Sequence, residues 1–296
     1  MVHQEPGQVL TPTARYAAVL GSPISHSLSP ALHCAAYRAL GLTNWSYGAH
    51  EVQAAELAGF VAGLGPQWAG LSLTMPLKEA AFEVADEVSE LAREVGAINT
   101  LVRGADGGWN GENTDVYGVG QALREAGCEN VVNAVILGSG ATARSVVAAL
   151  SSLGCRKVTF AVRAAPRQET LDQAGRAGFE VDVVPLDRVA DLLGETAVVV
   201  STLPMNALQG NTLPEDALTG RVFPKGPRPV GHLLMDVVYT GWPTPLARTF
   251  HEAGASVVSG LEMLVHQAAE QVRLMTGLCP PVDQMRAAGL AAMGPR

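Results

Sequence analysis

The feature that most constrains the fold of this chain is an apolar run that leads through a glycine loop into a helical pattern. Residues 135–137 read Val-Ile-Leu, Gly138-Ser139-Gly140 follow, and a stretch rich in alanine, valine and leucine extends from Ala141 to Leu153. Gly138-x-Gly140-x-x-Ala143 fits the dinucleotide fingerprint, in which two glycines admit a pyrophosphate and a small third residue lets the helix pack on the strand. In a chain with 32 glycines the pattern alone could be a plain strand–helix turn, but its context predicts a dinucleotide site.

Short apolar runs and helical patterns alternate on both sides of this loop. Strands are predicted at residues 16–20, 47–52, 70–74, 97–102, 131–137, 157–162, 180–184, 197–201 and 233–237. Helices are predicted at residues 29–40, 54–63, 116–126, 141–153, 168–177, 261–276 and 282–293. Ser29 suits the N-cap of the first helix, whereas Gly118 and Gly120 weaken the third. Prolines and glycines between residues 204 and 229 predict a long irregular region, and residues 1–15 a loose polar tail.

This order of elements predicts an α/β protein with two domains. Residues 1–115 plus 260–296 are expected to form an N-terminal α/β domain that binds the substrate and carries the catalytic residues. Residues 116–259 are expected to form a Rossmann-type doubly wound parallel sheet that binds the dinucleotide. The ligands are expected in the cleft between the two domains.

Composition and charge exclude several classes of protein. A formal net charge of −8 argues against a nucleic-acid surface, and no apolar run is long enough to span a bilayer. The start of the chain lacks the apolar centre of a secretion signal. Cys34, Cys128, Cys155 and Cys279 are scattered, so neither a disulfide framework nor a structural zinc site is expected. These features predict a cytoplasmic protein without a metal site. A small-molecule substrate and a monomeric or homodimeric state are also expected.

The end of the next predicted strand indicates which dinucleotide is bound. An NAD site usually carries an acidic residue about 20 residues after the glycine loop, where it binds the ribose 2′-hydroxyl. Here residues 157–162 lead into Arg163, Arg167 follows, and no acid occupies the strand end. Because a guanidinium matches a phosphate in charge and geometry, the sequence favours NADP(H). The alternative is that both arginines are solvated loop charges.

Two polar clusters in turns suggest the chemistry. Residues 71–78 read as a short strand that ends at Thr74 and Met75-Pro76, with Lys78 just beyond; Asn113-Thr114-Asp115 form the second cluster. A lysine, an aspartate and a nucleotide loop in one chain suggest proton transfer coupled to hydride transfer. On composition alone, a surface ion pair would be the default interpretation of Lys78 and Asp115.

From Tyr16 to about Met293 the chain resembles the shikimate dehydrogenase family. The resemblance rests on short motifs in a specific order: GSPISHSLSP at residues 21–30, LTMPLK at 73–78, GAINT at 96–100, GENTD at 111–115, the glycine loop, DVVY at 236–239 and GLEMLVHQAA at 260–269. Members of this family reduce 3-dehydroshikimate to shikimate with NADPH in aromatic amino-acid biosynthesis. The resemblance therefore implies an NADP-dependent oxidoreductase.

The resemblance also implies residue roles. Lys78 would be the principal acid/base, with Asp115 orienting it or sharing its proton as a coupled pair. The substrate carboxylate would contact Ser27, Ser29 and Tyr239, and the ring hydroxyls would contact Thr74, Asn99 and Gln267. The cofactor would contact the loop residues Gly138, Ser139, Gly140, Ala141, Thr142 and Ala143, the arginines Arg163 and Arg167, and Thr202, Val237 and Gly260. Taken singly, these polar residues could be a helix cap, loop or turn residues, strand packing or a helix surface.

The chain departs from the family pattern at a few positions. Ser72 stands where asparagine is common, Val237 where methionine is frequent, and residues 201–204 differ from the usual Asn-Ala-Thr form. Arg163 lacks the polar neighbours of the frequent Asn-Arg-Thr motif. Two readings therefore remain open beside the main one: a quinate/shikimate dehydrogenase of broader specificity using NAD, and a dinucleotide-binding sensor without catalysis. Serines at both 27 and 29 favour shikimate over quinate.

Overall fold

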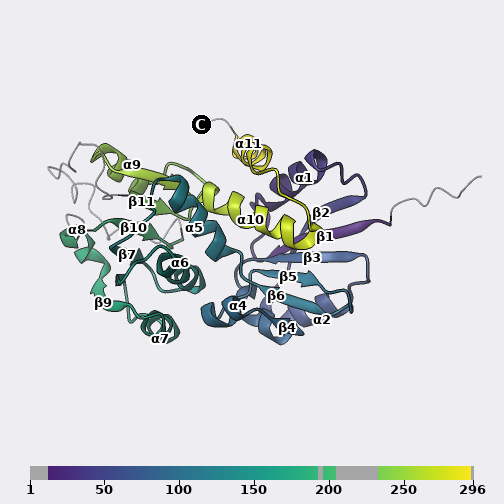
Figure 1. Ribbon diagram of the computed structural model, residues 1–296, viewed down its shortest axis with the longest axis horizontal. Helices are drawn as coiled ribbons and strands as arrows, with labels where there is room; N and C mark the ends of the chain where they lie inside the picture. The colour runs from purple at the N-terminus through teal and green to yellow at the C-terminus, as the bar shows by residue number, and fades with distance from the viewer. Residues whose placement is uncertain (1–12, 193–195, 205–232, 295–296) are drawn as a thin grey trace, which may run out of the picture.

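The structure, a computed structural model, describes residues 13–192, 196–204 and 233–294 (Figure 1). Within these residues the strands form two six-stranded sheets. This confirms the two-domain α/β fold predicted from the sequence. Residues 1–12 of the predicted tail and most of the predicted irregular region lie outside the described residues.

The first sheet is mixed rather than parallel throughout. Its order is β2-β1-β3-β5-β6-β4, with bounds Trp45–Glu51, Arg15–Gly21, Trp68–Leu73, Thr100–Arg103, Trp109–Glu112 and Glu87–Val88. Strand β1 pairs parallel with β2 and β3, whereas β5 runs antiparallel to both β3 and β6. The strand predicted at 97–102 begins only at Thr100, so Asn99 lies just before its start.

Helices of the first half are short except for α1. Helix α1 spans Ser29–Ala39, and the remaining segments are Ala54–Glu56 (η1), Leu57–Ala62 (α2), Leu77–Ala80 (α3), Ala81–Glu83 (η2) and Glu90–Val95 (α4). The prediction that Ser29 caps α1 was wrong. The N-cap is Leu28, Ser29 is the first helical residue, and no side chain caps this end. The Ser27 hydroxyl instead accepts a hydrogen bond from the Ser29 amide at 3.3 Å.

The second sheet is parallel, and its strand order is that of a doubly wound fold. The order is β12-β11-β10-β7-β8-β9, with bounds Ser256–Ser259, Leu233–Asp236, Val198–Ser201, Asn133–Leu137, Lys157–Val162 and Glu180–Pro185. The strand order reverses between β7 and β10, and the glycine loop leaves β7 at this switch point. The helices of this half are Ala141–Ser152 (α6), Gln168–Arg176 (α7), Leu186–Arg188 (η3), Val189–Leu192 (α8) and Pro245–Glu252 (α9). The sequence pattern predicts neither α9 nor β12.

Two long helices lie side by side at the junction of the sheets (Figure 1). Helix α5 spans Asp115–Glu125 and α10 spans Gly260–Thr276, followed by α11 at Val282–Ala292. Close contact with α10 explains why α5 has a glycine at position 118. A Cβ there would lie 2.6 Å from the Met263 carbonyl oxygen and 2.9 Å from Gln267 Cβ. The close approach offsets the roughly 1 kcal/mol that an interior glycine costs a helix. It brings Gln267 on α10 next to the start of α5.

The apolar face of α10 belongs to the core of the first sheet. Leu261, Val265 and Val272 are buried against Val19 of β1 and Leu32 of α1. The C-terminal part of the chain thus returns to the N-terminal sheet. No helix in the described part of the chain has the length and hydropathy required to cross a bilayer.

Candidate active site

A cavity of about 280 Å³ lies where the two sheets meet. Its walls come from the ends of β1, β3 and β11, from the first turns of α1, α3, α5 and α6, and from α10. Every residue predicted to be catalytic or to bind the substrate lines this cavity: Ser27, Ser29, Thr74, Lys78, Asn99, Asp115, Tyr239 and Gln267. Of the residues predicted to bind the cofactor, it is lined by Thr142, Val237 and Gly260.

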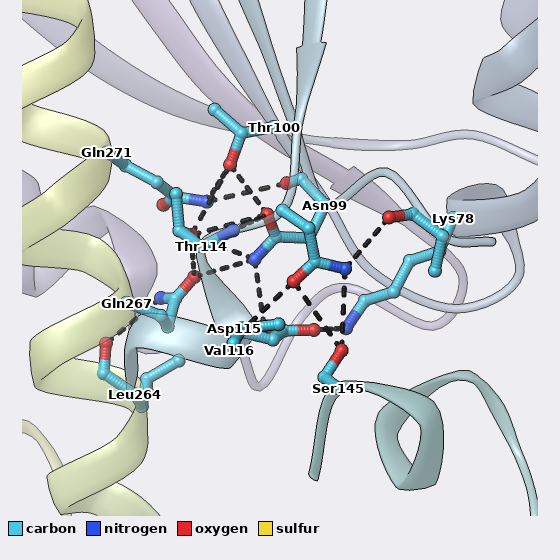
Figure 2. A network of polar contacts seen from close by, with 12 residues as sticks. Lys78, Asn99, Thr100, Thr114, Asp115, Val116, Ser145, Leu264, Gln267 and Gln271 are labelled. Carbon is cyan, nitrogen blue, oxygen red and sulfur yellow. Dashed lines mark hydrogen bonds and ion pairs between the residues drawn. The ribbon is translucent and has the colours of Figure 1, made fainter. Parts of the chain in front are cut away.

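Lys78 and Asp115 form an ion pair at the edge of the cavity (Figure 2). Lys78 lies in α3, the single turn that follows β3, and Asp115 is the first residue of α5. The Lys78 Nζ atom lies 2.5 Å from Asp115 Oδ2, and the two side chains are 16% and 6% exposed. The pair is therefore mostly buried, and a solvated surface ion pair does not describe it.

Asn99 holds the second oxygen of the Asp115 carboxylate. Its Nδ2 donates to Asp115 Oδ1 at 2.8 Å and to Thr114 Oγ1 at 2.9 Å. Its Oδ1 accepts from the Thr114 amide and from the Thr100 hydroxyl, both at 2.8 Å. With both ends of its amide engaged, Asn99 is fixed in rotation and fixes Asp115 in turn. These bonds run across the centre of Figure 2.

A second glutamine on α10, which the sequence did not single out, extends this network. Gln271 is 1% exposed, accepts from the Ser72 hydroxyl at 2.8 Å and donates to the Thr100 hydroxyl at 2.9 Å. Ser72 accepts from the Tyr47 hydroxyl at 2.6 Å. The available signal was spacing: Gln271 lies one helical turn after Gln267, so both point from the same face of α10. The serine at 72 is thus a member of a hydrogen-bonded network.

His33 contacts two members of this network, Tyr47 and Gln271. Its ring stacks on Tyr47 with centroids 3.9 Å apart, and its Nε2 lies 3.2 Å from Gln271 Oε1. Because Gln271 Oε1 is an acceptor, the His33 Nε2 must carry the proton. Complete burial lowers the pKa of His33 to about 3, which is only partly opposed by the Gln271 hydrogen bond. His33 is therefore a neutral structural residue near pH 7.

Three further hydroxyls line the cavity. Ser27 and Ser29 come from the segment that enters α1, and Tyr239 follows β11. Burial raises the pKa of the Tyr239 phenol, so the hydroxyl keeps its proton and can donate a hydrogen bond to an anion. Such a group of neutral donors suits a carboxylate.

The glycine loop has the backbone that a dinucleotide requires. Gly138 has a φ of 100°, a conformation that disfavours any side chain, and Gly140 is the N-cap of α6. A Cβ at Gly140 would meet nothing within 4 Å, which leaves room for a ligand to approach the helix start. Ser139 Oγ accepts from the Arg167 amide at 3.1 Å, and the Thr202 hydroxyl donates to the Leu137 carbonyl at 2.7 Å.

The remaining predicted cofactor residues lie outside the cavity. Ala143 is fully buried and packs in the core of the second sheet, as the fingerprint requires of its third position. Gly138, Ser139, Gly140 and Ala141 form the turn between β7 and α6, while Arg163 is exposed just beyond β8. Arg167 Nη1 lies 3.2 Å from Glu79 Oε1. The sequence did not reveal Glu79 as a partner for this arginine.

One group of side chains has the spacing of metal ligands. Atoms of Glu125, Glu262 and His266 all lie within 4.8 Å of one another. However, Arg286 donates to Glu125 Oε2 and to Glu262 Oε2, both at 2.8 Å. One guanidinium thus bridges the two carboxylates of this group and offsets half of their charge.

Comparisons with known proteins agree along nearly the whole chain. Family models match residues 19–101 (shikimate dehydrogenase substrate binding domain), 121–217 (shikimate / quinate 5-dehydrogenase) and 260–288 (shikimate 5′-dehydrogenase C-terminal domain). A shikimate dehydrogenase (NADP(+)) of a Synechococcus species is 36% identical over 279 residues, which covers 91% of this chain and 93% of that protein.

Solved structures give the same result. The shikimate dehydrogenase of Mycobacterium tuberculosis superposes with a TM-score of 0.82 at 41% identity, over 94% of this chain and 99% of that one. A quinate dehydrogenase of Corynebacterium glutamicum, solved in complex with NAD, superposes with a TM-score of 0.81 at 29% identity, over 94% of this chain and 99% of that one.

Proposed function

The chain belongs to the shikimate dehydrogenase family, and on that premise we propose that it catalyses the reversible, NADPH-dependent reduction of 3-dehydroshikimate to shikimate. The observation that carries the proposal is the mostly buried Lys78–Asp115 pair, which opens into a cavity lined by hydroxyls and amides. We propose that it acts in aromatic amino-acid biosynthesis in the cytoplasm, as a monomer or homodimer.

The binding of NADP(H) is assigned to the second sheet. The positive φ of Gly138 and the open space at Gly140 fit a pyrophosphate at the start of α6, with Ser139, Ala141 and Thr142 in the same turn. Arg163 and Arg167 are the candidate partners of the 2′-phosphate. The nicotinamide would contact Thr202 and Val237, which follow β10 and β11, and Gly260, the first residue of α10. When bound, the cofactor supplies or accepts the hydride.

Lys78 is assigned the proton. In the reductive direction its ammonium donates a proton to the substrate oxygen that becomes a hydroxyl, and in the oxidative direction the neutral amine takes it back. Asp115 orients Nζ through Oδ2, and Asn99 keeps that carboxylate from rotating through Oδ1. The pair therefore presents a proton in a fixed direction.

The substrate is assigned to the first domain together with α10. Ser27, Ser29 and Tyr239 offer three hydroxyl donors for one carboxylate, and Thr74, Asn99 and Gln267 offer polar groups for the ring hydroxyls. In this assignment residues 1–115 plus 260–296 form the substrate domain, and residues 116–259 form the cofactor domain. Closure of the two would exclude water from the hydride path.

An absorbance assay of NADP⁺ reduction tests the proposal. The purified chain is mixed with NADP⁺ and shikimate, quinate or aminoshikimate in parallel, and NADPH formation is followed. We expect turnover with shikimate to exceed that with quinate. No shikimate-dependent NADPH formation would contradict the proposal.

A second candidate is a dehydrogenase of broader specificity that uses quinate and NAD. It is favoured by the engagement of Arg167 with Glu79, because that pairing reduces the charge available to a 2′-phosphate. Comparable kcat/KM values for NAD⁺ and NADP⁺, with quinate accepted as well as shikimate, would establish it. Tight NADPH binding without turnover of any of the acids would instead indicate a non-catalytic sensor.

A further inference from the structure

Glu79, the residue directly after Lys78, connects the two halves of the molecule. Its Oε1 accepts from Arg144 Nη2 at 2.6 Å and lies 3.2 Å from Arg167 Nη1. Glu79 lies in α3 beside the first sheet, whereas Arg144 lies in α6 and Arg167 precedes α7, both beside the second. One carboxylate oxygen thus joins the turn that carries Lys78 to the cofactor half.

Arg144 makes this connection rigid. Its side chain is 4% exposed, its Nε donates to the Val95 carbonyl at 2.7 Å and its Nη2 donates to the Gly96 carbonyl at 3.0 Å. These carbonyls end α4, where the helix dipole attracts a cation. A buried guanidinium held by three acceptors has one orientation, since each lost bond leaves a charged donor without a partner.

The same helix carries residues at the reaction site. Helix α6 begins at Ala141, Thr142 lines the active-site cavity with Lys78, and Arg144 follows two residues later in the same first turn. The Arg144–Glu79 bond therefore sets the distance between the lysine turn and the turn proposed to hold the pyrophosphate. Coupled hydride and proton transfer requires Lys78 and the bound cofactor to hold fixed positions relative to the substrate. A displacement of about 1 Å can lower the rate about 100-fold.

We propose that Glu79 is a positioning residue, which acts through Arg144 to hold the turn of Lys78 in register with the cofactor-binding turn of α6. The inference rests on the proposed dehydrogenase function and deepens it. It assigns Glu79 no contact with substrate or cofactor. Its removal should slow hydride transfer without weakening substrate binding.

The test compares Glu79→Ala with Glu79→Gln, which keeps an acceptor for Arg144, and with Glu94→Ala as the matched control. Glu94 lines the same cavity as Arg144 and Arg167, and its removal changes the charge equally. Because the Glu79 side chain is 53% exposed, its truncation should leave the fold intact. Single-turnover oxidation of NADPH by 3-dehydroshikimate is measured with ordinary NADPH and with NADPH dideuterated at C4, beside melting temperature and the KM for 3-dehydroshikimate.

In Glu79→Ala we expect the single-turnover rate of hydride transfer to fall by about tenfold. The deuterium isotope effect on kcat should be larger than in the wild-type protein, and the KM for 3-dehydroshikimate should stay within about twofold of the wild-type value. Glu79→Gln should recover part of the rate, and Glu94→Ala should match the unchanged protein. An unchanged single-turnover rate in Glu79→Ala, or a loss that follows a lower melting temperature and a raised KM, would overturn the inference. Because the unchanged protein is assayed in parallel, its own lack of turnover would identify failure of the proposed function instead.

Discussion

The two sides of the candidate site are built in different ways. On the substrate side, Asn99, Thr100 and Gln271 are almost fully buried and bonded to one another or to Asp115 and Ser72. On the cofactor side the groups are mostly backbone, and the two arginines are exposed. The comparison indicates that proton transfer relies on a pre-arranged network, whereas cofactor binding relies on backbone shape plus charges that the ligand itself would order.

The largest effect on turnover should come from removing Lys78, the proton donor on the substrate side. Lys78→Ala should lower kcat by about 1,000-fold, because it removes the only group assigned to carry the proton, while shikimate still binds. Stopped-flow kinetics and equilibrium titration with shikimate separate the two effects. Lys157→Ala is the control, since Lys157 is the first residue of β8, at the opposite end of the strands from the glycine loop, and pairs with Glu180. Turnover of Lys78→Ala near that of the control would contradict the assignment.

The buried network should also make stability depend on pH through His33. Its pKa is about 3 in the folded protein and about 6.5 when exposed, so between these values the unfolded chain binds the extra proton. The free energy of unfolding should therefore fall on acidification, by up to about 1.4 kcal/mol per pH unit from this group. Urea unfolding at pH 6.5, 5.5 and 4.5 would show a steeper loss in the unchanged protein than in His33→Gln.

The exposed His50 provides the comparison for this experiment. His50→Gln should retain the full pH dependence, because it leaves the buried His33 in place. If His33→Gln and His50→Gln lose stability with pH in the same way, the buried imidazole does not govern acid sensitivity.

A smaller and more selective effect is expected on the cofactor side. Arg163→Ala should raise the KM for NADPH by about tenfold and leave the KM for NADH nearly unchanged, because only the former carries a 2′-phosphate. Arg176→Ala removes an exposed arginine of α7 and serves as the control. An equal effect of Arg163→Ala on both cofactors would remove the 2′-phosphate role.

The same division explains how much the sequence could reveal. Periodicity located the strands that bear the glycine loop and Thr74, and the family resemblance identified residues that line one cavity. The sequence did not identify Gln271, Arg144 or Glu79 as members of networks, because the partners of these side chains lie 48 to 238 positions away in the chain. Their roles depend on which helices meet, which local patterns do not encode.

The errors in secondary structure have similar causes. Strand β6 is short and reads Trp-Asn-Gly-Glu, so it has no alternating apolar pattern. Helix α9 was missed because Pro243 and Pro245 give its start the pattern of a turn, and β12 was missed because it has only four residues. A serine before a proline is typical of an N-cap, and this pattern predicts a cap at Ser29. In the structure α1 begins one residue earlier, with Leu28 as the N-cap and Ser29 as the first helical residue.

The central claim is that Lys78 and Asp115 act as one unit. A double-mutant cycle on the single-turnover rate constant tests this claim most directly. Lys78→Ala, Asp115→Asn and the double variant are compared in single-turnover reduction of 3-dehydroshikimate by NADPH. If the aspartate works only by orienting the ammonium, the double variant should be no slower than Lys78→Ala alone. A double variant slowed by the product of the two single effects would show that the two side chains act independently, and would contradict the account.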